Sequence, residues 1–162
     1  MCLLQLSLDI NSIRSKYEEE QKGICDLRIL SSNINISNPN QLKSLAEDII
    51  ICLKNNLDIL TGIKALANRL LEIIRNNQNY KEELEQEITN NVEYINNTLA
   101  LTKANYNDYI KKYRTGEFID ICRNNYNNLI PYIIELHDKN KYYLHMLSII
   151  IETINNIDNN NN

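Results

Sequence analysis

Apolar residues recur along this chain at alternating spacings of three and four positions, in four long stretches. This periodicity is typical of helices that bury one face, and its persistence over many turns favours coiled-coil-like packing at crossing angles of about 20°. We therefore predict helices over residues 3–32, 39–77, 80–114 and 117–157. Glycine and proline are rare, so the expected class is all-α.

The residues between these stretches carry signals of helix ends. Asn38 followed by Pro39 is expected to cap the second helix, with Gln41 as its capping-box partner. Asn79 is expected to cap the third helix, and Gly116 to end it in a left-handed conformation. Because the later connections are short, neighbouring helices should be antiparallel.

These features predict an elongated antiparallel four-helix bundle that forms one domain over residues 1–157. The Asn-rich residues 158–162 are expected to form a disordered tail. Pro131 lies inside the fourth stretch without disturbing its spacing. Proline removes a backbone donor and displaces the preceding turn, so we expect one continuous helix that is kinked at Pro131.

A few polar residues stand at apolar positions of these series. Folding the chain at the predicted turns brings four side chains to one level, which we interpret as a candidate polar layer: Glu20, Asn56, Thr102 and Tyr126. Such a layer lowers stability but fixes helix register. Asn140 is expected elsewhere, nearer the level of Asn91. The alternative is that Glu20 and Asn56 point outward.

The end of the fourth helix is a candidate partner-binding surface. In this register the third helix cannot cover the last turns of the fourth, which carry Ile154 and Ile157 on the same apolar seam. An exposed seam commonly marks an interface. The alternatives are that the start of the chain or a linker covers this end, or that the end frays.

Charge and composition limit the partners and the cellular location that we expect for the protein. Net charge is −4, from 17 basic and 21 acidic residues, so no nucleic-acid partner is expected. The four cysteines lack the spacing of a zinc site or disulfide framework, and we interpret them as reduced thiols. The first residues fit neither a signal peptide nor a membrane anchor. We therefore expect an intracellular, cytoplasmic protein, and the abundance of Asn, Ile, Tyr and Lys indicates an AT-rich genome.

No residue pattern indicates a catalytic, cofactor-binding or metal-binding site. His137 and His145 lack the spacings with which helices hold metal ions, and we expect both to face solvent. The glycines are too scattered for a phosphate-binding loop. Tyr106, Tyr109 and Tyr113 are expected to cover one end of the bundle. No cofactor and no enzymatic activity are therefore predicted.

One segment resembles a known family. The stretch around Pro131 reads LIPYIIEL and resembles the L-x-P-Y-[V/I]-x-x-L stretch of snapin-like subunits, which belong to complexes that build lysosome-related organelles. The resemblance runs from Leu129 toward Ile157, and the preceding part of the chain has more predicted helix than such subunits. It implies only a role as a subunit of an intracellular assembly.

The favoured hypothesis is a non-enzymatic structural or adaptor protein that acts through helix-mediated contacts with other protein subunits or with itself. The alternative is a membrane-associated trafficking or remodelling module, similar to a syntaxin-type regulatory bundle or a crescent-shaped lipid-binding dimer. A concave basic face would distinguish that alternative. An enzyme on a bundle scaffold, the third hypothesis, would require a buried cluster of carboxylates and histidines.

Overall fold

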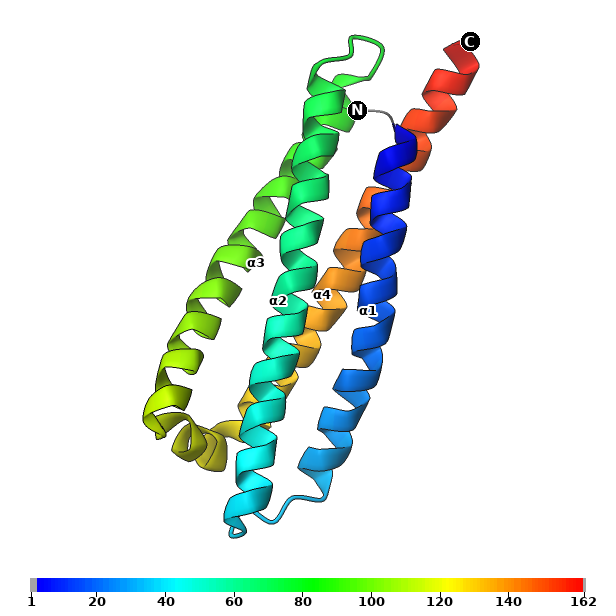
Figure 1. Cartoon of the computed structure of the whole chain (residues 1–162). Helices are drawn as coiled ribbons and strands as arrows, with labels where there is room; N and C mark the ends of the chain where they lie inside the picture. The colour runs from blue at the N-terminus through cyan, green and yellow to red at the C-terminus, as the bar shows by residue number, and fades with distance from the viewer. Residues whose placement is uncertain (1–2, 162) are drawn as a thin grey trace.

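The computed structural model describes residues 3–161, which form four helices joined by three connections (Figure 1). They are α1 (Leu3–Ser32), α2 (Pro39–Arg75), α3 (Glu82–Thr115) and α4 (Glu117–Asn161). Figure 1 shows an elongated bundle in which successive helices run in opposite directions. The predicted all-α antiparallel four-helix bundle is thus confirmed. No helix of the described residues is both long and apolar enough to cross a membrane.

The helices do not all contact one another. α2 and α4 run in the same direction and pack together, while α1 and α3 each pack against both of them. Within residues 3–161, α1 and α3 make no direct contact. The centre of the bundle is therefore the α2–α4 interface. α2 carries a long row of fully buried residues, such as Leu53, Leu60 and Ile63.

The start of α2 follows the predicted cap with one change. The Asn38 side chain accepts hydrogen bonds from the backbone N–H groups of Asn40 (3.0 Å) and Gln41 (3.3 Å). However, the Gln41 side-chain oxygen Oε1 accepts from the backbone N–H of Asn35 at 2.8 Å, so Gln41 does not close a capping box on Asn38. A capping box would need the Asn38 backbone N–H as a donor to the Gln41 side chain. That N–H instead donates to the Asn35 backbone carbonyl.

Of the two predicted boundaries of α3, the structure confirms the C-terminal one only. Gly116 has φ = 85°, as predicted for the residue that ends α3. At the other end the N-cap is Lys81, so the expectation for Asn79 is wrong. Asn79 is instead held in the turn before the helix, where its backbone N–H donates to the Asn77 side chain at 2.9 Å.

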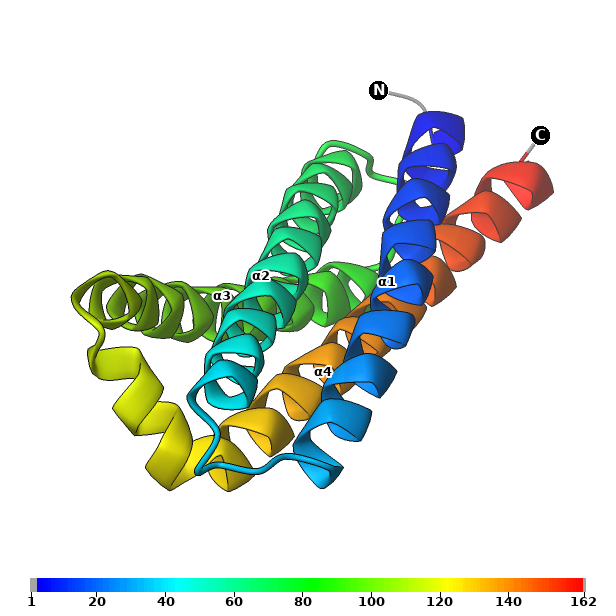
Figure 2. The same cartoon turned by 60° about the horizontal axis from the view of Figure 1, so that its bottom comes forward.

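The fourth helix is continuous and bent. Pro131 lies inside α4, and Figure 2 shows the yellow first part of α4 running across the bundle end before the helix turns along the bundle axis. Proline removes one intrahelical hydrogen bond and thereby permits such a bend. The bend lets Phe118 become fully buried, with its ring 5.3 Å from that of Tyr109 on α3.

The end of α4 differs from the expectation in two ways. The helix continues past residue 157 to Asn161, and the Tyr80 hydroxyl donates to the Asp158 carboxylate in this last part at 3.0 Å. The apolar seam is not left open either, since Ile154 is fully buried and Ile157 is half-buried against the core. The expected exposure of this seam is therefore wrong, and the alternative of a covered end agrees with the burial, while the binding of a partner by Ile154 and Ile157 stays a prediction. Residue 162 of the predicted tail lies outside the described residues.

Candidate functional site

A buried polar cluster lies at the centre of the bundle, between α2 and α4. His137 Nδ1 is 3.0 Å from the Asn56 side-chain oxygen, and the Asn140 amide donates to the Asn56 backbone carbonyl at 3.1 Å. The Asn56 amide nitrogen donates to the Cys52 carbonyl at 2.9 Å. Asn56 and Asn140 are fully buried, and His137 is 4% exposed. These bonds tie two helices that run side by side in the same direction.

The first helix joins this cluster through an aromatic stack. The Tyr17 ring lies parallel to the His137 imidazole, with centroids 4.1 Å apart and an angle of 8° between the planes. Tyr17 is itself buried, and this burial raises the pKa of its hydroxyl. We call Tyr17, Asn56, His137 and Asn140 the central cluster. The central cluster fixes the axial register of α1, α2 and α4 relative to one another.

The central cluster differs from the predicted polar layer. Asn56 is part of it, but the hydroxyl of buried Thr102 donates to the Thr98 carbonyl of its own helix at 2.7 Å. Tyr126 is only half-buried and packs against the apolar core. The expectation that Asn140 lies elsewhere is wrong, as is the expectation that His137 faces solvent. His145 is exposed, as expected.

Glu20 is buried beside the central cluster in a contact of its own. Its Oε2 accepts from the Asn55 amide at 2.8 Å, whereas Oε1 has no hydrogen-bond partner among residues 3–161. A Cβ on Gly23 would lie 3.0 Å from Oε1, so the missing side chain makes room for this carboxylate. Burial raises the pKa of Glu20, although the hydrogen bond from Asn55 and the nearby Cys52 thiol oppose that effect.

The protonation state of His137 follows from its partners. Because the Asn56 amide nitrogen donates to a carbonyl, its oxygen is the acceptor, and His137 Nδ1 must carry the proton. Nε2 has no partner among the described residues. Burial lowers the pKa of His137 below its usual value of 6.5, as do the charges of Arg28 and Lys141, while Asp138 opposes them. The imidazole is therefore neutral at pH 7.

The chemistry of these groups favours a structural role. Burial raises the pKa of the Cys52 and Cys122 thiols to about 12, so both stay protonated and poorly nucleophilic. No three His, Cys, Asp or Glu side chains within residues 3–161 are placed to hold a metal ion. Cys25, Cys52 and Cys122 are free, and Cys2 lies outside the described residues.

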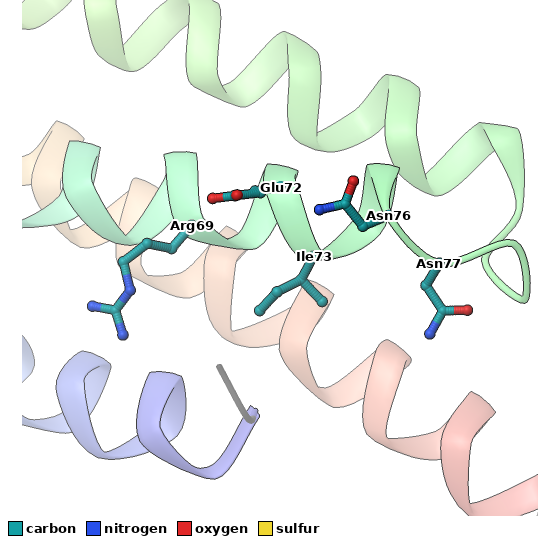
Figure 3. A pocket seen from close by; sticks show the side chains of 5 residues that line it. All are labelled: Arg69, Glu72, Ile73, Asn76 and Asn77. Atoms are coloured by element: carbon teal, nitrogen blue, oxygen red, sulfur yellow. The ribbon is translucent and has the colours of Figure 1, made fainter.

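A shallow pocket near the end of α2 does not bring reactive groups together. Its lining side chains all come from the last turns of α2 and the following turn (Figure 3): Arg69, Glu72, Ile73, Asn76 and Asn77. In Figure 3 the Arg69 side chain extends toward α1, where it forms an ion pair with Asp9 at 2.8 Å. That ion pair connects α1 to α2, so we assign Arg69 to the packing of the bundle.

A groove between α3 and α4 gathers exposed apolar side chains. Two adjoining concavities of about 350 and 560 Å³ follow the line where these helices meet. The rim carries Tyr94 (66% exposed) and Leu101 (60%) from α3 and Tyr142 (56%) from α4. We call this feature the α3–α4 groove. The other large apolar residues that are exposed in the described chain line neither of these two concavities.

The floor of the α3–α4 groove is polar and internally bonded. The Thr98 and Tyr143 hydroxyls are 2.8 Å apart, and the Asn105 amide donates to the Tyr132 hydroxyl at 3.0 Å. These bonds hold α3 against α4 below the exposed rim. Sequence reasoning missed the groove, although Tyr94 and Leu101 give a signal: they lie one heptad apart and outside the main apolar series of the third helix.

Comparisons with known proteins give no match for this chain, either among protein-family models or among curated proteins and solved structures.

Proposed function

We propose that this chain is a non-enzymatic structural or adaptor protein, a cytoplasmic subunit of an intracellular assembly that binds another protein through the α3–α4 groove. The observation that carries the proposal is the exposure of Tyr94, Leu101 and Tyr142 along two adjoining concavities. Tyrosine is enriched where proteins bind one another, because its ring is rigid and apolar while its hydroxyl tolerates water.

The charge distribution supports a protein partner over nucleic acid or a membrane. A nucleic-acid or anionic-lipid surface attracts a face of unpaired basic residues. At the α3–α4 turn, where basic residues gather, Lys112 pairs with Asp108 and Arg123 with Asp120. These pairs leave only Lys111 and Arg114 there without an ion pair among the described residues. The net charge of −4 also disfavours binding to nucleic acid or to an anionic membrane. The membrane module remains the competing proposal, and co-sedimentation with anionic vesicles tests it directly.

The test is affinity capture from the native cell with three versions of the full chain. One is the parent, one carries Tyr94→Ser with Tyr142→Ser, and the control carries Leu4→Ser with Leu8→Ser. The control removes comparably exposed apolar groups from α1, which does not contact α3. Proteins that are captured by the parent and the control, but lost from the groove variant, support the proposal. Equal capture by all three versions rejects it.

A further inference from the structure

We propose that the α3–α4 groove receives an amphipathic helix of a partner protein, whose apolar stripe is flanked by lysine or arginine. This inference rests on the proposed function, because it specifies the partner chemistry for the same surface. It follows from the spacing of the rim residues, the bonding of the floor and the charges along the α4 edge.

The spacing of the exposed residues matches a helical occupant. Tyr94 and Leu101 lie one heptad apart on α3. On α4, Tyr142 lines the same concavity as Tyr94, and Tyr132 and Leu136 line the concavity that holds Leu101. Residues one heptad apart stand on the same helix face at a separation of about 10 Å. A third helix placed along the groove would meet Tyr94 and Tyr142 at one end and Leu101 about two turns further along. This is the arrangement by which helices add to an existing bundle.

The bonding of the floor disfavours an extended peptide. An extended chain needs partners for its own backbone N–H and C=O groups, and the two helices that form the walls have bonded theirs internally. The Thr98–Tyr143 and Asn105–Tyr132 bonds each occupy part of the hydrogen-bonding capacity of the floor hydroxyls, so the floor has far fewer free groups than an extended backbone needs. A helix brings its backbone bonds with it, so apolar contact with the rim is sufficient for docking.

The charges along the groove favour a basic occupant. On α4, Glu135 and Asp138 line the groove together with a single cation, Lys139, which lies 3.6 Å from Glu135. The edge therefore has a net negative charge, and lysine or arginine beside it would gain attraction. The tyrosine faces add favourable sites for cations. A second copy of this chain docked symmetrically through the same groove would bring the same acidic edge and be repelled.

The test uses a displayed library of amphipathic peptides with a fixed leucine heptad seam. Positions beside the seam vary among Lys, Glu and Ser, and the library is selected against the full chain. We expect enriched peptides to carry lysine, and to lose about tenfold or more in affinity for the Tyr94→Ser, Tyr142→Ser variant. Replacing Glu135 and Asp138 by Lys should reverse the preference toward glutamate. The control, Glu18→Lys with Glu19→Lys on α1, makes the same change in net charge away from the groove.

The other outcomes overturn the inference. They are no enrichment, enrichment of acidic or neutral flanks, unchanged binding to the groove variant, or a self-association of the parent chain that the groove variant abolishes. If captured cell proteins still depend on the groove while the library shows no preference for lysine, the partner chemistry is wrong and the proposed function stands. If capture is also independent of the groove, both fail.

Discussion

His137 on α4 donates a hydrogen bond from Nδ1 to the Asn56 side chain on α2 across 3.0 Å, in the interior of the bundle. The bond joins two helices that are not neighbours in the sequence. A slip of either helix would leave a buried donor and a buried acceptor without partners, which typically costs about 1–3 kcal/mol for each group. This one pair therefore fixes the register of the α2–α4 interface.

The Asn56–His137 pair can be measured by a double-mutant cycle. Asn56→Leu leaves the His137 Nδ1 proton buried without an acceptor, so we expect a loss of about 1–3 kcal/mol in the free energy of unfolding. His137→Phe keeps a ring against Tyr17 but leaves the Asn56 oxygen unpaired. The double variant removes both polar groups and should be more stable than the two single losses predict. Urea unfolding of the four proteins gives the coupling energy, and simple additivity would show that the pair does not act as a unit.

His137 should also make stability depend on pH. Its pKa is lowered in the folded state, so its contribution is fully present above the unfolded value of about 6.5 and is lost as pH falls through the lower folded value. Between these two pKa values, His137 is protonated in the unfolded chain and neutral in the folded protein. We expect His137→Gln to flatten the decrease in unfolding free energy between about pH 7.5 and 5.5. Exposed His145, changed to Gln, is the control. Equal slopes in the parent and His137→Gln would contradict this origin.

Glu20 should have the opposite pH dependence. Its pKa is raised, so its contribution is fully present below the unfolded value of 4.5 and is lost as pH rises through the folded value. At neutral pH a buried charge with an unpartnered Oε1 lowers stability. Glu20→Gln should therefore raise the unfolding free energy at pH 7.5 by roughly 1 kcal/mol, and the gain should vanish in acid. Thermal unfolding of Glu20→Gln and of the exposed control Glu19→Gln distinguishes burial from a general charge effect.

The helices and their order could be predicted because the evidence for them is local. Apolar periodicity reports which face of a helix is buried, and short connections make successive helices antiparallel. Asn38 and Gly116 act through neighbouring residues, so both predictions hold. The prediction for Asn79 is wrong because Asn is common both at helix N-caps and in the turns that precede them, so its presence does not specify the first residue of the helix.

The central cluster could not be predicted in the same way. Turn positions relate each helix to the next, but they do not say how α2 and α4 meet, and the bend before the middle of α4 changes its register. That is why Asn140 and His137 were placed wrongly. A signal was present, since Asn140 interrupts an apolar series one turn after His137. Two polar residues on one buried face would each need a partner.

Gly116 is expected to be sensitive to substitution for backbone reasons alone. Its φ of 85° suits glycine, and a Cβ at this position would meet no atom within 4 Å. Gly116→Ala should therefore lower the unfolding free energy by about 1 kcal/mol, while Gly116→Asn should cost less because Asn tolerates this conformation. Chemical denaturation of both variants checks the ranking. If Ala and Asn cost the same, conformational strain is not the cause.

The last prediction concerns the final turns of α4, which the sequence suggested would be disordered. The Tyr80 hydroxyl, from the linker between α2 and α3, donates to both oxygens of Asp158, at 3.0 and 3.2 Å. Burial and the neighbouring carboxylate raise the pKa of Tyr80 to about 12, so the phenol keeps its proton throughout the physiological range. Tyr80→Phe removes this bond and retains the ring that packs against the core.

We expect that change to loosen the end of α4 without unfolding the bundle. A lost bond to a charged, partly exposed acceptor is worth about 1 kcal/mol, which corresponds to roughly fivefold faster amide hydrogen exchange in residues 155–161. Exchange in the middle of α4 and the melting temperature should stay nearly unchanged. Asp158→Asn keeps an acceptor for the hydroxyl and should show a smaller increase. Unchanged exchange in Tyr80→Phe would mean that apolar packing of Ile154 and Ile157 alone orders these turns.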